Sequence, residues 1–125
     1  MRVVSTATAP AAVGPYSQAI VAGSLVFVSG QIPLVPGSAD FAGPDIVAQT
    51  RQCLKNIEAI LAAEGLTLKQ VVKTTVLMQD LGEFAAMNQV YAEVFGEHKP
   101  ARATFQVAAL PKAAKVEIEA IASRE

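Results

Sequence analysis

The sequence predicts a single α/β domain over residues 1–125, in which a mixed β-sheet carries two helices packed on one face. Three observations predict this class. The 125 residues fall in the usual size range of one domain, and 52% of them are hydrophobic against 17% charged. Two segments repeat apolar residues at helical spacing, and short strand-like segments surround them. Their order is two or three strands, a helix, a strand, a helix and two strands.

The N-terminal segments predict short strands joined by turns. Residues 3–5 and 16–21 are extended candidates, and residues 25–29 form a β-rich apolar run reached through Ala22-Gly23-Ser24, which is a hairpin signal. Residues 31–43 contain two prolines and two glycines, too many breakers for a helix or a strand. We therefore expect a loop there.

Two helices follow from the apolar spacing. The first opens with Gly43-Pro44-Asp45 and ends before Gly65, and its apolar and small residues recur at Ile46, Thr50, Cys53, Leu54, Ile57, Ile60 and Leu61. The second begins at Asp80-Leu81-Gly82-Glu83, which has the cap residue and the acidic third position of a capping box. Its apolar positions are Phe84, Met87, Tyr91, Val94 and Phe95, and Gly96 is a stop signal.

The remaining segments predict three strands and an uncovered sheet face. Residues 71–79, 103–109 and 115–122 are extended candidates. In the last of them Val116, Ile118, Ala120 and Ala122 share one face, and Glu117, Glu119 and Ile121 share the other. Helices on one side leave the second sheet face without a cover. A mean hydropathy of +0.38 is high for so small a chain, so we expect identical subunits to cover part of its surface.

Composition argues against several classes of function. Ten Lys and Arg against eleven Asp and Glu give a net charge of -1 with no basic stripe and no Trp, which disfavours nucleic acid as a partner. The apolar stretch at residues 19–28 is too short to span a membrane, and it lies too far from the N-terminus to be a leader. The sequence therefore predicts a cytoplasmic protein without a membrane partner.

The single cysteine and the single histidine also limit the chemistry. Cys53 cannot form an intrachain disulfide, and we expect it to be a buried core residue. His98 lies among polar residues between two elements, where we expect a solvated loop histidine. With one Cys and one His, no protein metal site is expected, and no phosphate loop or nucleophile elbow is present.

Polar residues in or beside the predicted strands are the remaining candidates for functional residues. Arg102 follows Pro100-Ala101 at the mouth of a strand, where it is either an ordinary surface arginine or a two-pronged anchor for a carboxylate. Glu117 and Glu119 are ordinary surface carboxylates if their face is solvated. If a partner buries that face, one of them can have a raised pKa and act as an acid or base. Residues 14–18 and 29–33 are turn-like segments that could equally mark turns or present an anion site.

Taken together and in order, these segments resemble the RidA family, the YjgF-type reactive intermediate (enamine/imine) deaminases. The match spans nearly the whole chain. Its carriers are Ala9-Pro10-Ala11-Ala12-Val13 with Gly14-Pro15-Tyr16-Ser17-Gln18-Ala19, then Val28-Ser29-Gly30-Gln31-Ile32-Pro33, Val72-Lys73-Thr74-Thr75-Val76, Asn88, Pro100-Ala101-Arg102-Ala103-Thr104, and Leu110-Pro111 followed by Lys115-Val116-Glu117-Ile118-Glu119-Ala120-Ile121-Ala122.

The resemblance implies a chorismate-mutase-like fold and a homotrimer whose sheets meet around a central barrel, with active sites in the clefts between subunits. It implies hydrolysis of 2-aminoacrylate-type enamines and 2-imino acids to 2-keto acids and ammonia, that is, a 2-iminobutanoate/2-iminopropanoate deaminase without a cofactor. Such imines are released by pyridoxal-phosphate enzymes that act on serine or threonine.

The resemblance also implies roles for individual residues. Arg102 would grip the substrate carboxylate, and Glu117 would position the attacking water and transfer protons. Tyr16, Ser29 and the backbone of Gly30 would line the same cleft from a neighbouring subunit.

Two further substrate-binding positions follow from the same resemblance. Asn88 would contribute from the second helix. Thr104 stands where many relatives have a cysteine, so a thiol role is absent here, and hydrolysis would need only the backbone of this residue. Residues 96–99 form a shorter loop than in some relatives, which affects the expected substrate range.

A different class of function fits the same residues. A non-catalytic protein of this fold could bind a 2-keto acid or act as a chaperone through exposed apolar surface. The presence of Glu117 beside Arg102 in the pattern favours the enzyme, because a ligand sensor needs the arginine but has little use for the glutamate.

Overall fold

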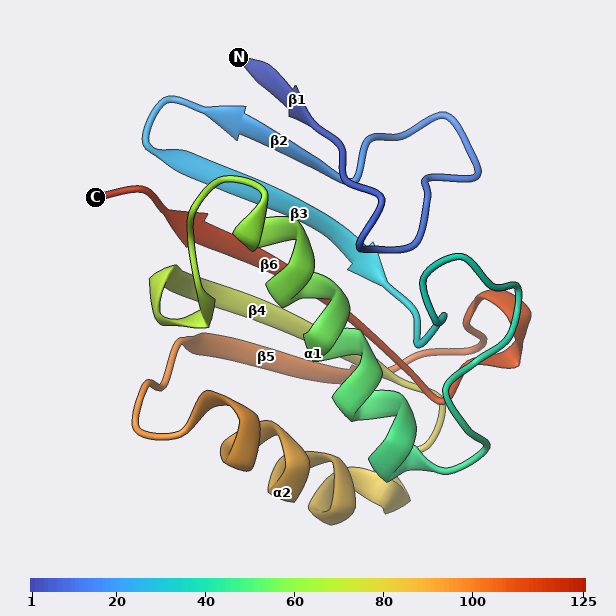
Figure 1. Ribbon diagram of the computed structural model, residues 1–125. Coiled ribbons are helices and arrows are strands. Elements are labelled where there is room, and N and C mark those ends of the chain that lie inside the picture. Colours follow the sequence, from blue (N-terminus) through green and yellow to red (C-terminus); the bar gives the residue numbers. More distant parts are fainter.

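Six strands pair into one mixed sheet with the order β1-β2-β3-β6-β4-β5 in the computed structural model, which describes residues 1–125 (Figure 1). Only β4 and β5 run parallel, and every other neighbouring pair is antiparallel. The strands are β1 (Arg2–Val4), β2 (Ala19–Ala22), β3 (Leu25–Gln31), β4 (Val71–Met78), β5 (Ala101–Gln106) and β6 (Val116–Ser123). The predicted order of elements is confirmed.

The N-terminal hairpin forms where its turn residues allow it. Gly23 has φ 61°, in the left-handed region that glycine tolerates, and it joins β2 to β3. The predicted strand over residues 16–21 is wrong in its first half, because the Tyr16 amide donates to the Gly14 carbonyl at 2.8 Å and turns the chain. Pairing with β3 begins only at Ala19.

The two helices begin and end at residues that satisfy their free backbone groups. The Asp45 carboxylate accepts a 2.7 Å hydrogen bond from the Ala48 amide at the start of α1 (Ile46–Ala62). Helix α2 (Phe84–Phe95) stops at Gly96, whose φ is 67°.

The predicted capping box before α2 is wrong. The Asp80 carboxylate accepts from the Gly82 amide at 2.8 Å and caps a short 3₁₀ turn at Leu81–Glu83, so it does not reach the helix itself. The Glu83 carboxylate turns away to accept from Lys115 Nζ at 3.1 Å.

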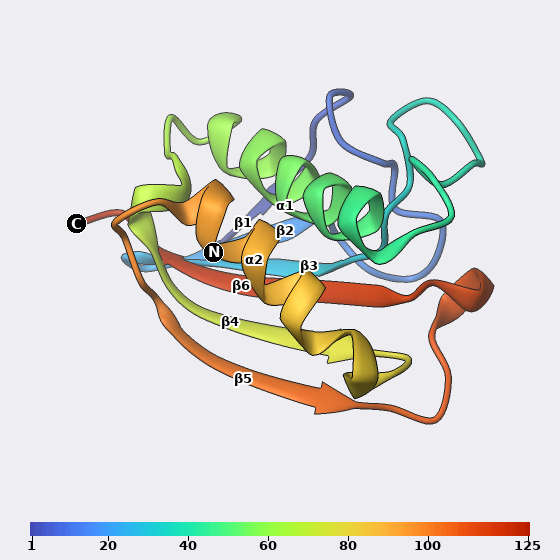
Figure 2. The same cartoon turned by 90° about the horizontal axis from the view of Figure 1, so that it is seen from below.

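The hydrophobic core lies between the sheet and the two helices, which cover the same face (Figures 1 and 2). Cys53 is part of it with no exposed surface, as predicted, and its thiol is 3.7 Å from the Val116 carbonyl oxygen. Burial raises the pKa of that thiol well above its usual value, with the nearby Glu117 charge as the smaller cause. The cysteine is therefore a core residue.

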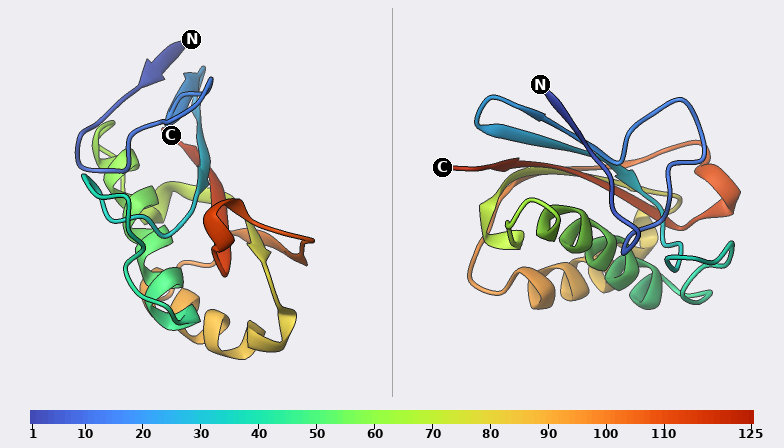
Figure 3. Two further views of the ribbon diagram at one scale, coloured as in Figure 1. Left: turned by 90° about the vertical axis from the view of Figure 1, so that its right-hand side faces the viewer. Right: turned by 45° about the horizontal axis from the view of Figure 1, so that its top comes forward.

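The opposite face of the sheet carries no helix (Figures 2 and 3). The predicted alternation in β6 is confirmed: the residues from Val116 to Ala122 at even positions are buried, and Glu117, Glu119 and Ile121 lie on the open face. One row of paired residues crosses all six strands on this face, namely Val3, Ile20, Phe27, Ile121, Lys73 and Ala101. No helix of the structure is long and apolar enough to cross a membrane.

Candidate functional site

Arg102 lies in the edge strand β5 and faces helix α2. Its register partner in β4 is Thr74, which is buried on the helix side, so Arg102 occupies the same side. One guanidinium nitrogen donates to Asn88 Oδ1 at 2.7 Å. The guanidinium carbon lies 4.7 Å from the ring centroid of Tyr91 and 5.6 Å from that of Phe84. The side chain is therefore held from several directions by one helix.

The charge of Arg102 has no carboxylate partner. The three ion pairs of the structure join Arg2 to Glu64, Arg51 to Glu93 and Lys115 to Glu83. A half-buried, oriented guanidinium whose remaining donors are unused is suited to bind an anion, and its planar fork matches a carboxylate. Beside it lies a cavity of about 380 Å³, lined by Asn88, Tyr91, Ala92, Phe95, Gly96, His98, Lys99, Pro100 and Arg102.

Thr104 lies on the same face of β5, two residues after Arg102. Its register partner Val76 is fully buried under the helices. The Thr104 hydroxyl oxygen is buried and has no hydrogen-bond partner within the chain. It is thus a polar atom near the arginine with unused hydrogen-bonding capacity.

A second cluster forms around Glu117 on the open face of the sheet. A Cβ on Gly30 would lie 2.3 Å from Glu117 Oε2, so the carboxylate lies directly against the backbone at Gly30. The register between β3 and β6 shifts in this segment, between Val28 and Gln31. Burial raises the pKa of Glu117 above the usual glutamate value, and the nearby charge of Glu119 raises it further. A carboxylate with a raised pKa accepts a proton more readily than an ordinary glutamate does.

Ser29 directly precedes Gly30 in β3, and its hydroxyl contacts Ser17, the residue that follows Tyr16. The Ser29 hydroxyl donates to the Ser17 carbonyl at 2.6 Å, so its oxygen can still accept a hydrogen bond. Tyr16 has 50% of its surface exposed, and no hydrogen bond to its hydroxyl is present. Tyr16 is therefore accessible but not fixed within one chain.

Gln18 was identified from the sequence only as part of a turn-like segment, and its anchoring role was not predicted. It is 4% exposed, and its side-chain amide accepts from the Thr6 amide at 2.7 Å while donating to the carbonyls of Thr6 and Pro10. It anchors the loop that precedes Tyr16 to the start of β2. The only signal in the sequence was a polar residue directly before an apolar strand.

His98 differs from the prediction of a solvated loop residue. It is half-buried, and its Nε2 lies 2.6 Å from the Val71 carbonyl oxygen, so it ties the loop after α2 to the start of β4. No three His, Cys, Asp or Glu side chains lie close enough together to bind a metal ion.

The Arg102 cluster and the Glu117 cluster lie far apart in one chain. Arg102 pairs with Thr74 and Glu117 pairs with Leu77, so the two are three residues apart along β4 and lie on its opposite sides. An odd separation places their side chains on opposite faces of the sheet. Strand geometry puts their Cα atoms about 14 Å apart, from a rise of about 3.3 Å per residue and a strand spacing of about 4.8 Å. One small molecule cannot reach both within a single chain.

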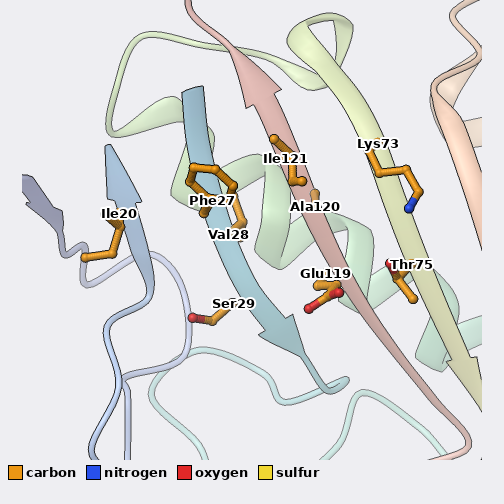
Figure 4. A pocket seen from close by; sticks show the side chains of 9 residues that line it. All are labelled: Ile20, Phe27, Val28, Ser29, Lys73, Thr75, Glu119, Ala120 and Ile121. Carbon is orange, nitrogen blue, oxygen red and sulfur yellow. The ribbon is translucent and has the colours of Figure 1, made fainter. Parts of the chain in front are cut away.

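A pocket of about 340 Å³ lies on the open face and is lined by residues of β2, β3, β6 and β4 (Figure 4). Ser29 and Glu119 lie at one end of it, and Phe27 and Ile121 lie at its apolar end (Figure 4). Lys73 and Thr75 line its β4 side. No ion pair joins Lys73 to Glu119. This polar and apolar mixture is open to solvent in one chain.

Comparisons with known proteins find a matching family, similar sequences and similar solved structures. The family described as Endoribonuclease L-PSP matches residues 6–124. A RutC family protein of Sinorhizobium fredii is 56% identical over 120 residues, which cover 96% of this chain and 95% of that protein. The human protein named 2-iminobutanoate/2-iminopropanoate deaminase is 46% identical over 121 residues, with 97% and 88% covered. The crystal structure of E. coli TdcF with bound serine superposes with a TM-score of 0.95 at 44% identity, covering 100% of both chains.

Proposed function

This chain belongs to the Endoribonuclease L-PSP family, the YjgF/RidA family, and we propose that it is a hydrolytic deaminase of small 2-imino acids. The observation that carries the proposal is the oriented and unpaired Arg102, held by Asn88 and Tyr91 beside a cavity. Relatives named as deaminases support the same reaction at 46% identity and above. The substrates are 2-iminobutanoate, 2-iminopropanoate and their enamine tautomers, and the products are 2-keto acids and ammonia.

In this proposal Arg102 binds the substrate carboxylate through two parallel hydrogen bonds. The contact fixes the position of C2, the electrophilic imine carbon, because C2 is directly bonded to the carboxylate carbon. Asn88 keeps one guanidinium nitrogen in place, and the free hydroxyl of Thr104 is available to a substrate atom or a water. An imine is already electrophilic, so orientation supplies a large part of the catalysis and no cofactor is needed.

Glu117 acts as the proton carrier. Its carboxylate accepts a proton from water as the water oxygen bonds to C2 of the protonated imine, whose C=N π electrons move to the nitrogen, which gives a neutral carbinolamine. Glu117 then gives this proton to the amino nitrogen. As the C–N bond breaks, ammonia leaves with the bonding electron pair, the carboxylate takes the hydroxyl proton, and the C2–O bond becomes the keto group. An enamine first takes a proton at C3 to form the imine. The raised pKa of Glu117 suits both directions of this transfer.

The complete site in this proposal is formed by two copies of the chain. Arg102, Asn88 and Thr104 come from one copy, and Glu117, Ser29, Gly30 and Tyr16 come from another. The separation of the two clusters within one chain supports this division, and so does the open sheet face, which needs a cover. We propose the homotrimer with a central barrel as the assembly.

The test is a coupled assay with a serine or threonine dehydratase, which releases the enamine. Added wild-type protein is expected to speed the formation of 2-keto acid, and Arg102→Ala is expected to remove that effect. Arg51→Ala is the matched control, because Arg51 is an exposed arginine of α1 paired with Glu93 and remote from both clusters. Equal rates with and without the wild-type protein would overturn the proposal.

The family description also names an endoribonuclease, an activity that we do not propose for this chain. Ten basic residues are balanced by eleven acidic ones, and the single histidine is engaged with the Val71 carbonyl. Binding along an RNA backbone normally uses clustered Lys and Arg. Adding a structured RNA to the coupled assay as a competitor is expected to leave the deamination rate unchanged.

A further inference from the structure

We propose that Tyr91 is a positioning residue, whose ring, held in place by Thr74, orients the Arg102 guanidinium to receive a carboxylate. This inference rests on the proposed role of Arg102 as the carboxylate anchor. It assigns a function to a residue of α2 that the helical pattern alone identifies only as part of the core.

The first step is the way in which Tyr91 contacts the guanidinium. All N–H donors of arginine point outward in one plane, and an aromatic ring that packs against the face of that plane uses none of them. The 4.7 Å separation between the guanidinium carbon and the Tyr91 ring centroid lies within cation–π range. Asn88 takes one donor at 2.7 Å. The ring and the amide therefore hold the guanidinium through two contacts, and no hydrogen bond within the chain takes its remaining donors.

The second step is that the ring itself is immobile. The Tyr91 hydroxyl and Thr74 Oγ1 are 2.7 Å apart, and Tyr91 and Thr74 are 7% and 1% exposed. The ring also packs against Phe95, with centroids 4.6 Å apart. Burial raises the pKa of Tyr91, so a neutral hydroxyl pairs with Thr74 at neutral pH. Helix α2 and strand β4 therefore both fix the position of the Tyr91 ring.

The third step separates Tyr91 from the other ring near the guanidinium. Phe84 is farther away, at 5.6 Å, and 36% of it is exposed, so it has freedom that Tyr91 lacks. Thr74 is also the register partner of Arg102 in the sheet. The hydrogen bond therefore ties the ring to the strand position directly beside the arginine.

The experiment compares Tyr91→Leu, Tyr91→Phe and a matched control, Val90→Ala, which removes buried volume from the same helix without touching Arg102. Calorimetry gives the Kd of 2-ketobutanoate, a product that binds without turnover, and the coupled assay gives KM and kcat. Tyr91→Leu is expected to raise Kd and KM about 5-fold, within the range of a desolvated cation–π contact, and to leave kcat within about 2-fold. Tyr91→Phe keeps the ring but loses the hydrogen bond to Thr74, so its Kd is expected to lie between those of the wild type and Tyr91→Leu.

The control distinguishes positioning from simple stability. Val90→Ala is expected to lower Tm and leave Kd unchanged. An unchanged Kd in Tyr91→Leu, or the same rise in Kd in Val90→Ala, would overturn the inference. If the wild-type protein binds 2-ketobutanoate with this variant pattern but does not accelerate deamination, the proposed function fails and the positioning role stands. If the wild-type protein deaminates and Tyr91→Leu keeps its Kd, only the positioning role fails.

Discussion

Glu117 and Glu119 are alternate residues of one strand with different surroundings. Glu117 is half-buried against Gly30, whereas Glu119 is exposed on the open face. Burial is the larger cause of the raised pKa of Glu117, and the like charge of Glu119 adds to it. The glutamate that the family resemblance implies as the proton carrier is therefore also the one whose environment suits that task.

The pH dependence of the reaction follows from this pair. The carboxylate must be ionised to accept a proton from water, so the rate is expected to fall as the pH drops through the raised pKa of Glu117. Glu119→Gln removes the like charge, lowers the pKa of Glu117 and shifts the acidic limb of the kcat profile to lower pH. The measurement is the pH–rate profile with imine generated by an amino-acid oxidase, after subtraction of spontaneous hydrolysis.

The control for this prediction is the pH range above the acidic limb, where kcat no longer changes with pH. There Glu117 is ionised in both proteins, so wild type and Glu119→Gln are expected to have the same kcat. An acidic limb that stays in place, or moves to higher pH, would show that the charge of Glu119 does not act on the proposed proton carrier, Glu117.

At the scale of elements, regular patterns were predictable and contacts between distant segments were not. The spacing of α1 and the alternation of β6 follow from local periodicity, so the burial of Cys53 and the placement of Glu117 on the open face could be predicted. The side of the sheet on which Arg102 lies could not be predicted, because the edge strand β5 has no alternating burial. This strand also begins at Ala101, two residues before the predicted start. The orientation of Arg102 depends on α2 packing alongside.

Irregular segments were the least predictable part of the fold. The loop at residues 32–43 is held by Asn56 Nδ2, which donates to the Leu34 carbonyl at 2.9 Å, and by Lys112 Nζ, which donates to the Ala39 carbonyl at 2.6 Å. Lys112 and Ala113 both have positive φ values, 57° and 58°. Side chains that bind carbonyls tens of residues away leave no periodic signal in the sequence.

Strand β3 offers a test of how an element positions Glu117, the proposed proton carrier. In Gly30→Ala the new methyl group would meet Glu117 Oε2 at 2.3 Å, and the carboxylate must move because it is the flexible partner. Stability is expected to change by less than about 1 kcal/mol, since no backbone conformation with positive φ is involved. The value of kcat is expected to fall by at least about 10-fold, because the proton carrier is displaced.

Thermal unfolding and kcat together check this prediction. Gly37→Ala is a suitable contrast: Gly37 has φ 77° and open space around it, so its substitution strains the backbone of a remote loop. That variant is expected to lose stability and keep kcat. If Gly30→Ala also loses only stability, the carboxylate does not need its position against β3.

At the scale of the whole molecule, the open sheet face is the dominant feature. Val3, Phe27 and Phe105 are 59%, 41% and 54% exposed, and all three lie on this face by register or alternation. Charged Lys73 and Glu119 lie among them without pairing to each other. A surface that combines apolar area with unpaired opposite charges is suited to a second copy of itself, which accords with the proposed trimer.

A mixing experiment tests whether two copies share each site. Arg102→Ala and Glu117→Gln are each expected to be inactive alone. The two variants are then co-expressed in equal amounts. A site formed between two copies has both native residues only if the copy that contributes Arg102 carries Glu117→Gln and the copy that contributes Glu117 carries Arg102→Ala. Random assembly makes that combination about one quarter of the sites, so about a quarter of the wild-type kcat is expected in the mixture.

A site formed within one chain predicts a different activity for the mixture, so the experiment distinguishes the two arrangements. If Arg102 and Glu117 acted within one chain, every subunit of the mixture would lack one of them and activity would stay at the level of the single variants. A co-expressed pair of wild type with Arg102→Ala calibrates the assay, since half of the sites then keep both residues under either arrangement. Light scattering on the same samples verifies the trimer, and a stable monomer with full activity would contradict the shared site.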